Sequence, residues 1–282
     1  MIRPRSAQDL AAVSAHYDTL DPFYREIWGE HVHHGYWRTG RESPAQAAVA
    51  LVELVADRLD LVPGQTVCDI GCGYGATAAL LAETRGALVT GITLSAVQHR
   101  QAARRRPSRG VLEVRLGDWL ANDFPDASFD RAYAIESTEH MAEKAQCFAE
   151  AFRVLRPGGR LVVCAWLAAP APRHWEIQHL LEPICREGRL AGMGDEAEYV
   201  GLLEGAGFRV ERTEDVSASV ARTWSVCLRR SLRRLATDRR YPRFLLHSGT
   251  PDRVFAITLF RLLLAYRTGA MRYAVLTAAK SA

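Results

Sequence analysis

The hydrophobic and polar positions of the chain first follow a helical period. Residues 43–61 read SPAQAAVALVELVADRLDL, and Val52, Val55 and Leu59 recur at the spacing that places them on one stripe of a helix. Ser43 stands at a capping position and is followed by a proline, which the first helical turn tolerates. The pattern predicts an amphipathic helix that ends where Pro63-Gly64 follows.

Beyond this helix the period changes, and short apolar runs alternate with helical stretches. Helices are predicted from about Ala76, from Ser95 and up to about Leu155. Short apolar strands that alternate with helices are typical of a parallel sheet with both faces covered. The predicted strands cover residues 65–70, 87–92, 112–116, 129–135 and 160–166.

The alternation is interrupted after Trp166 by a proline-bearing loop. Roughly residues 174–187 have helical character, and a second helix closed by Gly205 and Gly207 leads into a strand at 208–216. Helical periodicity then runs through about 220–269, and the chain finishes on a predicted last strand.

No internal repeat and no clear linker divides the chain, so we expect a single domain over residues 1–282. Its expected parts are an N-terminal helical cover, a cofactor-binding core, a helical lid insertion that binds an acceptor and includes one core helix and strand, and the last strand. These parts cover residues 1–42, 43–168, 169–270 and 271–282.

Composition and charge add little to this picture. The 282 residues carry a formal charge of +4, and nearly all the basic residues are arginine, which suits a GC-rich genome. The densest run, Arg229 to Arg240, recurs at helical spacing and is interpreted as a solvated helix face. Six scattered cysteines form no CxxC pair, which favours reduced, buried thiols over a zinc site.

No apolar run approaches the roughly 18 residues that a membrane span needs. The start MIRPRSAQDL does not resemble a signal peptide, so a cytoplasmic location is expected.

A glycine-rich loop follows the first predicted strand in VCDIGCGYGA, residues 67–76. Glycines let a backbone turn sharply and approach a ligand, but the loop also satisfies the loose GxGxxA form of dinucleotide-binding proteins. A nicotinamide site would need an acid about 20 residues further on, where this chain has Gly91-Ile92-Thr93-Leu94-Ser95. A carboxylate at Asp69 would repel a diphosphate and suits a cationic amino-acid ligand better.

Two further motifs accompany the loop, namely Gly117-Asp118-Trp119 and LRPGGR at 155–160. With them the chain resembles class I S-adenosylmethionine-dependent methyltransferases, in which DxGxGxG, GD and LxPGG recur together. The resemblance covers about residues 65–166. It implies an α/β, doubly wound, Rossmann-like methyltransferase fold with a seven-stranded, mostly parallel sheet, whose last strand, here 272–279, is antiparallel.

Rarer motifs narrow this resemblance. GITLSAVQ (91–98), ESTEHM (136–141), HVHHGYW (31–37) and the tail at 266–280 are similar to the tocopherol methyltransferase group and its bacterial relatives that act on small natural products. Cyclopropane fatty-acid synthases share GITLS-like and EH elements. They usually carry a YSCAYF-like segment where this chain has HHGYW, so lipid cyclopropanation is kept as an alternative.

The resemblance implies a cofactor, S-adenosylmethionine, with S-adenosylhomocysteine as its product. The methionine part would lie against the glycine loop, the ribose against the segment after strand two, and the adenine against the motif after strand three, while the cover and strand four complete the site. The implied residues are, in that order, Asp69, Gly71, Gly73 and Gly75; Thr93, Leu94 and Gln98; Asp118 and Trp119; and Tyr17, His34 and Glu136. For Trp119 the alternative is a core aromatic.

Glu136, Glu139 and His140 follow the fourth strand, at the edge where open α/β sheets bind ligands. A histidine that titrates near neutrality, beside a carboxylate that fixes its tautomer, is suited to remove a proton. We therefore expect His140 to be the base. The alternative is a local hydrogen-bonding residue at a helix start.

HVHHGYW contains three imidazoles, but a metal needs three or four convergent ligands, and His31, His33 and His34 share one short segment. We expect no metal there. The resemblance instead makes the segment, with Tyr17, a cover in which aromatic faces attract a sulfonium cation. Packing alone is the alternative.

The expected function is methyl transfer to a small aromatic or polycyclic natural-product acceptor at carbon, nitrogen or oxygen, by in-line displacement. A nucleic-acid methyltransferase is less favoured, because Glu136-Ser137-Thr138-Glu139 stands where many such enzymes carry an (Asp/Asn)-Pro-Pro-aromatic motif. A nicotinamide oxidoreductase and a non-catalytic cofactor-binding module are further alternatives. The sequence leaves a homodimer open.

Overall fold

The computed structural model describes residues 1–282 except 7, 9 and 247–254. One sheet runs through it in the strand order β3-β2-β1-β4-β5-β7-β6. Neighbouring strands pair in parallel except at β7, which is antiparallel to both β5 and β6. The strands are β1 (Thr66–Ile70), β2 (Leu88–Thr93), β3 (Val111–Leu116), β4 (Phe129–Ile135), β5 (Leu155–Ala168), β6 (Arg209–Asp215) and β7 (Met271–Ala279).

The predicted seven-stranded, mostly parallel sheet is confirmed, and only strand lengths differ. β5 begins at Leu155 rather than near 160, because Leu155 pairs with Phe129 of β4. It continues to Ala168 because β7 pairs with it from Arg160 onward.

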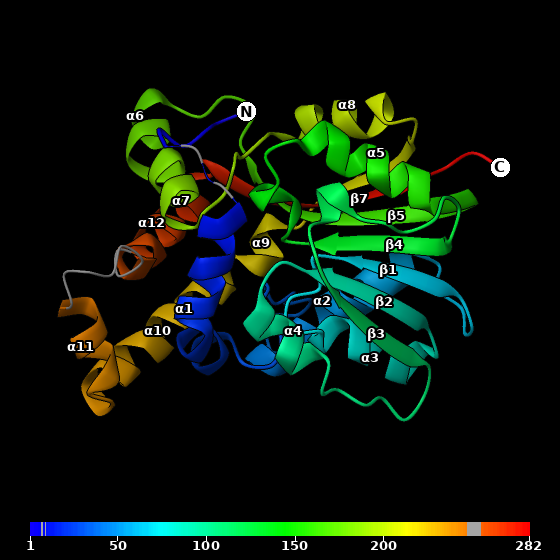
Figure 1. Cartoon of the computed structure of the whole chain (residues 1–282). Helices are drawn as coiled ribbons and strands as arrows, with labels where there is room; N and C mark the ends of the chain where they lie inside the picture. Colours follow the sequence, from blue (N-terminus) through cyan, green and yellow to red (C-terminus); the bar gives the residue numbers. More distant parts are fainter. Residues whose placement is uncertain (7, 9, 247–254) are drawn as a thin grey trace.

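Helices cover both faces of the sheet (Figure 1). On one face α2 and α3 pack with Val67 and Tyr133, and on the other α5 and α8 pack with Cys68 and Ala132. Consecutive strand residues thus point into different cores, as a strand's period of two requires. The helices of these layers are α2 (Pro44–Arg58), α3 (Ala76–Arg85), α4 (Ala96–Ala102), α5 (Lys144–Val154) and α8 (Glu196–Gly205).

A third core lies beside the sheet, where α1, α7, α10 and α12 pack together (Figure 1). It contains Ile27, Ile184, Trp224 and Leu262, all buried. The helices outside the two sheet layers are α1 (Leu10–Trp28), α6 (His174–Glu176), α7 (Glu182–Glu187), α9 (Ser217–Val220), α10 (Arg222–Thr237), α11 (Arg240–Leu246) and α12 (Phe255–Thr268). Short turns of other helical type are η1 (Trp119–Ala121), η2 (Thr138–His140) and the π turn η3 (Ile177–Leu181).

Local sequence signals account for several helix ends. The predicted helix over 43–61 begins at Pro44, and the Ser43 hydroxyl accepts from the Gln46 amide while the Gln46 side chain accepts from the Ser43 amide. The predicted helical stretches at 174–187 and 220–269 are also helical where described, while 247–254 lies outside the described residues.

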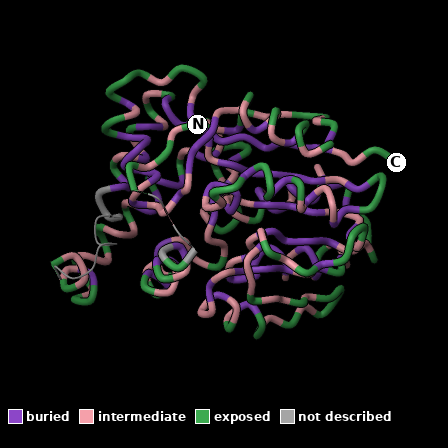
Figure 2. The backbone as a smooth tube through the Cα atoms, turned by 45° about the horizontal axis from the view of Figure 1, so that its top comes forward, coloured by how far each residue is buried: buried purple, intermediate pink, exposed green. Residues whose placement is uncertain are grey.

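Burial follows the layers, with purple on the inner strands and green on the outer helix faces (Figure 2), while the edge strands β3 and β6 have no buried residue. All six cysteines are buried and unpaired, as predicted. Among the described residues, none of the helices is both long and apolar enough to cross a membrane.

Candidate active site

The glycine-rich loop leaves β1 and turns into α3 through three left-handed glycines, Gly71, Gly73 and Gly75, with φ of 83°, 52° and 67°. A Cβ on Gly71 would lie 2.4 Å from the Cβ of Ser137, whereas one on Gly73 would meet nothing closer than the Gln98 side chain at 3.8 Å. Gly71 therefore permits close packing, and Gly73 leaves its backbone open to the cavity described below.

Asp69 lies at the end of β1 and is 3% exposed. Its carboxyl accepts one hydrogen bond from the Tyr133 hydroxyl at 2.7 Å. Burial raises the pKa of Asp69 to about 7, although the Tyr133 hydrogen bond lowers it. A buried carboxyl that faces a cavity and forms no ion pair with the described residues fits the amino group of S-adenosylmethionine, which would supply that charge.

The segment after β2 forms the next wall. The Thr93 hydroxyl donates to the Gln98 side chain at 2.9 Å, and Ser95 caps α4 by accepting from the Gln98 amide. Helix α1 is tied to this wall, because the Ser95 hydroxyl donates to Asp18 and the Ser14 hydroxyl donates to the Leu94 carbonyl at 3.4 Å. Thr93, Leu94 and Gln98 all line the cavity.

Asp118 and Trp119 follow β3 and also line the cavity. Asp118 caps the η1 turn by accepting from the Leu120 amide at 3.0 Å. Trp119 is 2% exposed, and its indole donates to the Cys147 carbonyl on α5 at 3.1 Å. The ring is thus packed in the core, and a contact of Trp119 with the adenine stays a prediction.

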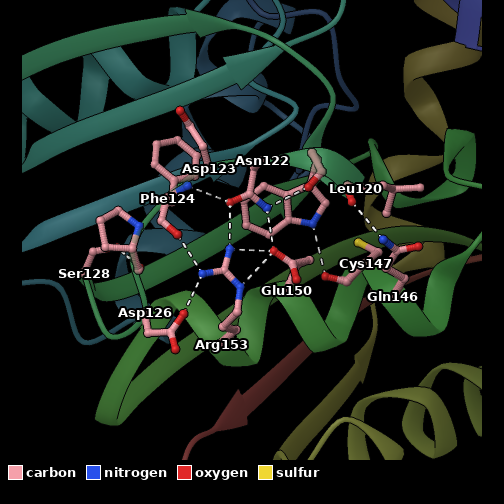
Figure 3. A network of polar contacts seen from close by, with 12 residues as sticks. Leu120, Asn122, Asp123, Phe124, Asp126, Ser128, Gln146, Cys147, Glu150 and Arg153 are labelled. Atoms are coloured by element: carbon pink, nitrogen blue, oxygen red, sulfur yellow. Dashed lines mark hydrogen bonds and ion pairs between the residues drawn. The ribbon is translucent and has the colours of Figure 1, made fainter.

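A polar network fastens this loop to α5 (Figure 3). The Asn122 side chain donates to the Trp119 carbonyl and to Glu150, both at 2.8 Å. The Arg153 guanidinium donates to Glu150 at 2.6 Å, to Asn122 at 3.1 Å and to the Phe124 carbonyl at 2.6 Å. The loop that presents Asp118 and Trp119 is therefore fixed from behind by a helix.

Glu136 is the centre of a buried hydrogen-bond cluster. Its Oε1 accepts from the His34 amide at 2.7 Å, from His34 Nδ1 at 3.0 Å and from the Tyr273 hydroxyl at 2.8 Å. Its Oε2 accepts from the Trp166 indole at 2.9 Å. Burial alone would raise its pKa, but His34 and the hydrogen bonds lower the pKa of Glu136 to about 2.

The backbone of Glu136 is strained, with φ at 53° in a residue that is not glycine. The four donors already occupy its carboxylate, so Glu136 connects the segment around residue 34 to β5 and β7. It lines the cavity, whereas His34 does not. His34 lies behind Glu136 and is 1% exposed, with its Nε2 in contact with the Tyr266 hydroxyl at 3.1 Å.

Replacing this carboxylate should destabilise the fold. We expect Glu136→Ala to lower the free energy of unfolding by about 3 to 5 kcal/mol, because buried donors left unpaired cost about 1 to 3 kcal/mol each. Glu136→Gln keeps an oxygen and the shape, and should lose less than half of that. Urea unfolding followed by circular dichroism measures both. A loss below 1 kcal/mol in the alanine variant would show that the cluster does not hold the cover.

His140 lies in η2 and lines the cavity. Its Nδ1 donates to the Arg189 carbonyl at 3.0 Å, because a carbonyl oxygen can only accept. In the neutral ring, Nε2 is therefore free of a proton and accepts. There the Tyr17 hydroxyl donates to it at 2.9 Å. The structure thus brings Tyr17 and His140 together at one wall of the cavity.

Two expectations about His140 need correction. Burial lowers its pKa to about 4, so the ring does not titrate near neutrality. The Arg189 carbonyl, not a carboxylate, fixes its tautomer, because the Glu139 side chain points elsewhere. Glu139 accepts from the Trp166 amide at 2.5 Å, is 1% exposed and does not line the cavity. Burial raises the pKa of Glu139 above its usual range.

Two of the three histidines of HVHHGYW, His31 and His33, meet at Thr77, whereas His34 contacts Glu136. His33 donates from Nδ1 to the His34 carbonyl at 2.8 Å, and His31 and His33 both contact the Thr77 hydroxyl. Burial lowers the pKa of His31 to about 3. The part of the chain that the structure describes holds no group of three or more His, Cys, Asp or Glu arranged for a metal.

Most of these residues line one cavity that opens to solvent, whereas His34 and Glu139 do not line it. Its wall is formed by α1, residues 30–33, the glycine loop and the ends of β2, β3 and β4. The described residues of 169–270 do not line it. Helix α1 lies against the cavity, and the insertion packs behind α1 through Ile27. That the insertion binds the acceptor therefore stays a prediction. None of the described lysines or arginines lines the cavity either.

Some residues of the site were missed from the sequence. Tyr133, the partner of Asp69, stands opposite it in the register of β1 and β4. Aligning β1 with β4, once these strands are known to be neighbours, would have placed Tyr133 opposite Asp69. The Arg189 carbonyl carries no sequence signal, because every residue type has a backbone carbonyl.

Comparison with known proteins identifies this architecture. Residues 5–238 match the profile of the family described as mycolic acid cyclopropane synthetase. Among curated relatives, 27-O-demethylrifamycin SV methyltransferase of Amycolatopsis mediterranei is 35% identical over 217 residues, 74% of this chain and 78% of that protein. Chloroplastic tocopherol O-methyltransferase of Arabidopsis thaliana is 29% identical over 291 residues, 95% of this chain and 81% of that protein.

Solved structures share the fold over nearly the whole chain. The [4+2]-cyclase SpnF has a TM-score of 0.82 and 29% identity, covering 100% of this chain and 99% of that one. The mycolic acid cyclopropane synthase CmaA1, solved with S-adenosylhomocysteine, has a TM-score of 0.85 and 23% identity, covering 98% and 99%. The chain therefore belongs to the mycolic acid cyclopropane synthetase family and is an S-adenosylmethionine-dependent methyltransferase of small molecules.

Proposed function

We propose that the enzyme methylates an uncharged, largely apolar metabolite, aromatic or polycyclic, that carries a weakly acidic group such as a hydroxyl. The supporting observation is the cavity itself, which joins the buried Asp69 to the Tyr17–His140 pair and has no lysine or arginine among its described lining residues. An acceptor carboxylate or phosphate would find no lysine or arginine among the described lining residues, so an anionic acceptor would lose hydration without a protein cation in return.

In this proposal the cofactor lies along the ends of β1, β2 and β3. Asp69 accepts from its amino group, and the open backbone at Gly73 leaves room for its methionine part, while Gly71 lets the loop pack against Ser137. Thr93, Leu94 and Gln98 adjoin the ribose, and Asp118 and Trp119 adjoin the adenine. When bound, the cofactor supplies a methyl group on a positively charged sulfur.

The chain contributes position and a proton acceptor. Neutral His140 can take a proton at Nε2, and the Tyr17 hydroxyl that occupies this nitrogen can pass the proton from an acceptor hydroxyl to it. The anionic Glu136 in the wall favours positive charge nearby. Orientation of the two reactants in the cavity can supply about 7 to 11 kcal/mol of the barrier reduction. No covalent enzyme intermediate is needed.

Nucleic acid is disfavoured as the acceptor for the same electrostatic reason, since nucleic-acid binding depends on lysine and arginine that neutralise phosphates. A cyclopropane-type lipid reaction remains the alternative that the family description raises. The uncharged part of the cavity lining should favour a neutral acceptor over an anionic one. The acceptor panel below therefore includes both neutral and anionic acceptors.

The test is incubation with methyl-labelled S-adenosylmethionine and a panel of phenols, quinols, indoles and sugars, each paired with its phosphate ester where one exists, and with phospholipid vesicles. Mass spectrometry reads the added methyl group. We expect label on neutral members and none on the phosphate esters. Preferential labelling of the esters, of lipid chains or of RNA would contradict the proposal.

A second candidate is cyclisation of an acceptor without methyl transfer, because the full-length match to SpnF is with a protein described as a [4+2]-cyclase. Cyclisation of this kind rearranges bonds and leaves the mass unchanged. Consumption of a polyene acceptor with an isomeric product and no label would support this second candidate over methyl transfer.

A further inference from the structure

Lysine is almost absent from this chain, which has 36 basic residues but only Lys144 and Lys280 as lysines. Both occur in the same arrangement. The Lys144 ammonium donates to the Met141 carbonyl at 3.0 Å and the Glu139 carbonyl at 3.4 Å, and Lys280 donates to two carbonyls, of Phe152 and Leu155, at 2.7 Å each. A compact ammonium can serve two converging carbonyls, which the planar guanidinium of arginine serves less well.

Lys144 occupies a position that is electrostatically unfavourable for a lysine. It is the first residue of α5, where the helix dipole disfavours a cation, and it is 3% exposed. Burial lowers its pKa, against the attraction of the nearby Glu139. Residues that break local rules without an evident gain in stability tend to serve the function of a site.

The two carbonyls that Lys144 holds lie on either side of His140. The Glu139 carbonyl also accepts from the Ala191 amide at 2.8 Å, and the His140 ring donates to the Arg189 carbonyl at 3.0 Å. The η2 turn is thus held from α5 on one side and from residues 189–191 on the other. The direction of His140 Nε2 toward Tyr17 depends on both attachments.

We propose that Lys144 is a positioning residue that holds the carbonyls flanking His140 and so aims its Nε2 into the cavity. This inference rests on the proposed role of His140 in methyl transfer. Lys144 touches neither the cavity nor the reacting groups, and it acts through the backbone of η2.

The test compares Lys144→Met with Lys280→Met. Each variant removes an ammonium from two carbonyls, but Lys280 lies at the opposite end of β5 and outside the main cavity. We expect Lys144→Met to lower kcat roughly 10- to 100-fold, because a misplacement of about 1 Å can cost about 100-fold. The dissociation constant for the cofactor should change less than about threefold, while Lys280→Met keeps kcat within about twofold.

Two further measurements separate positioning from general damage. The Nδ1 proton of His140, assigned by its loss in His140→Ala, should exchange with water faster in Lys144→Met but not in Lys280→Met. Lys144→Arg, which retains donors and charge, should recover at least part of the lost kcat. If the methionine variant fails to fold, Lys144→Gln is measured in the same way.

A double-mutant cycle keeps this inference distinct from the proposed function. If Lys144 acts through His140, adding Lys144→Met to His140→Ala should lower kcat by less than about threefold further. Full additivity, unchanged kcat in Lys144→Met, or equal losses in both lysine variants would overturn the inference. Unchanged kcat in His140→Ala alone would instead overturn the proposed base, whatever Lys144 does.

Discussion

The Asp69→Ala variant should lose cofactor binding, with a dissociation constant for S-adenosylmethionine raised at least about 100-fold. The reason is that Asp69 is a buried carboxylate facing the cavity, and removing one member of a buried charged hydrogen bond costs about 3 kcal/mol or more. Isothermal titration calorimetry measures the change. Asp69→Asn keeps the shape and the Tyr133 contact, so it isolates the charge.

Affinity should also depend on pH through the same group. The pKa of Asp69 is raised to about 7, so below pH 7 the carboxyl of the free enzyme is mostly protonated. Binding of a cationic amino group needs the ionised form, so the dissociation constant should rise by up to about tenfold per pH unit below 7. Asp69→Asn should show no such slope. Equal affinity in Asp69→Ala and the unchanged enzyme would remove Asp69 from the cofactor site.

The His140→Ala variant should bind the cofactor normally and transfer the methyl group slowly. We expect kcat to fall by about 10² to 10⁴-fold, the usual contribution of a positioned acid or base. Tyr17→Phe removes only the hydroxyl that bonds Nε2, and should lower kcat by a smaller factor. His179→Ala, an exposed histidine outside the cavity lining, serves as the matched control.

The pH profile adds a second test of His140. Its pKa is lowered to about 4, so the ring stays neutral and able to accept a proton throughout the neutral range. At saturating cofactor, kcat should therefore be flat from about pH 8 to 5 and fall only near pH 4, while kcat/KM for the cofactor falls below pH 7 through Asp69. A limb of kcat near pH 6.5 would contradict the buried, neutral His140 seen here.

Much of the fold follows from local sequence. Ser43 and Gln46 mark the start of α2, and the strands from β1 to β4 begin or end within a few residues of their predicted positions. The glycine loop could be predicted because a left-handed backbone, as at Gly71, Gly73 and Gly75, is adopted readily by glycine and rarely by other residues.

The chemistry around His140 was less readable, because it depends on contacts between distant segments. The Arg189 carbonyl comes from the insertion, 49 residues along the chain, and no residue type announces it. The pKa of His140 follows from burial, which a sequence position does not reveal. The described insertion packs its apolar side chains into the third core behind α1, a contact between distant segments that local sequence does not reveal.

The cluster around Glu136 can form only late during synthesis of the chain on the ribosome. Its donors come from His34, Trp166 and Tyr273, so the carboxylate obtains its last partner only after residue 273 has been synthesised. The glycine loop and the first four strands emerge long before that. A nascent chain should consequently form the glycine loop and its neighbouring strands early and complete the Glu136 cluster late, so that the wall at Glu136 is unfinished during the interval between.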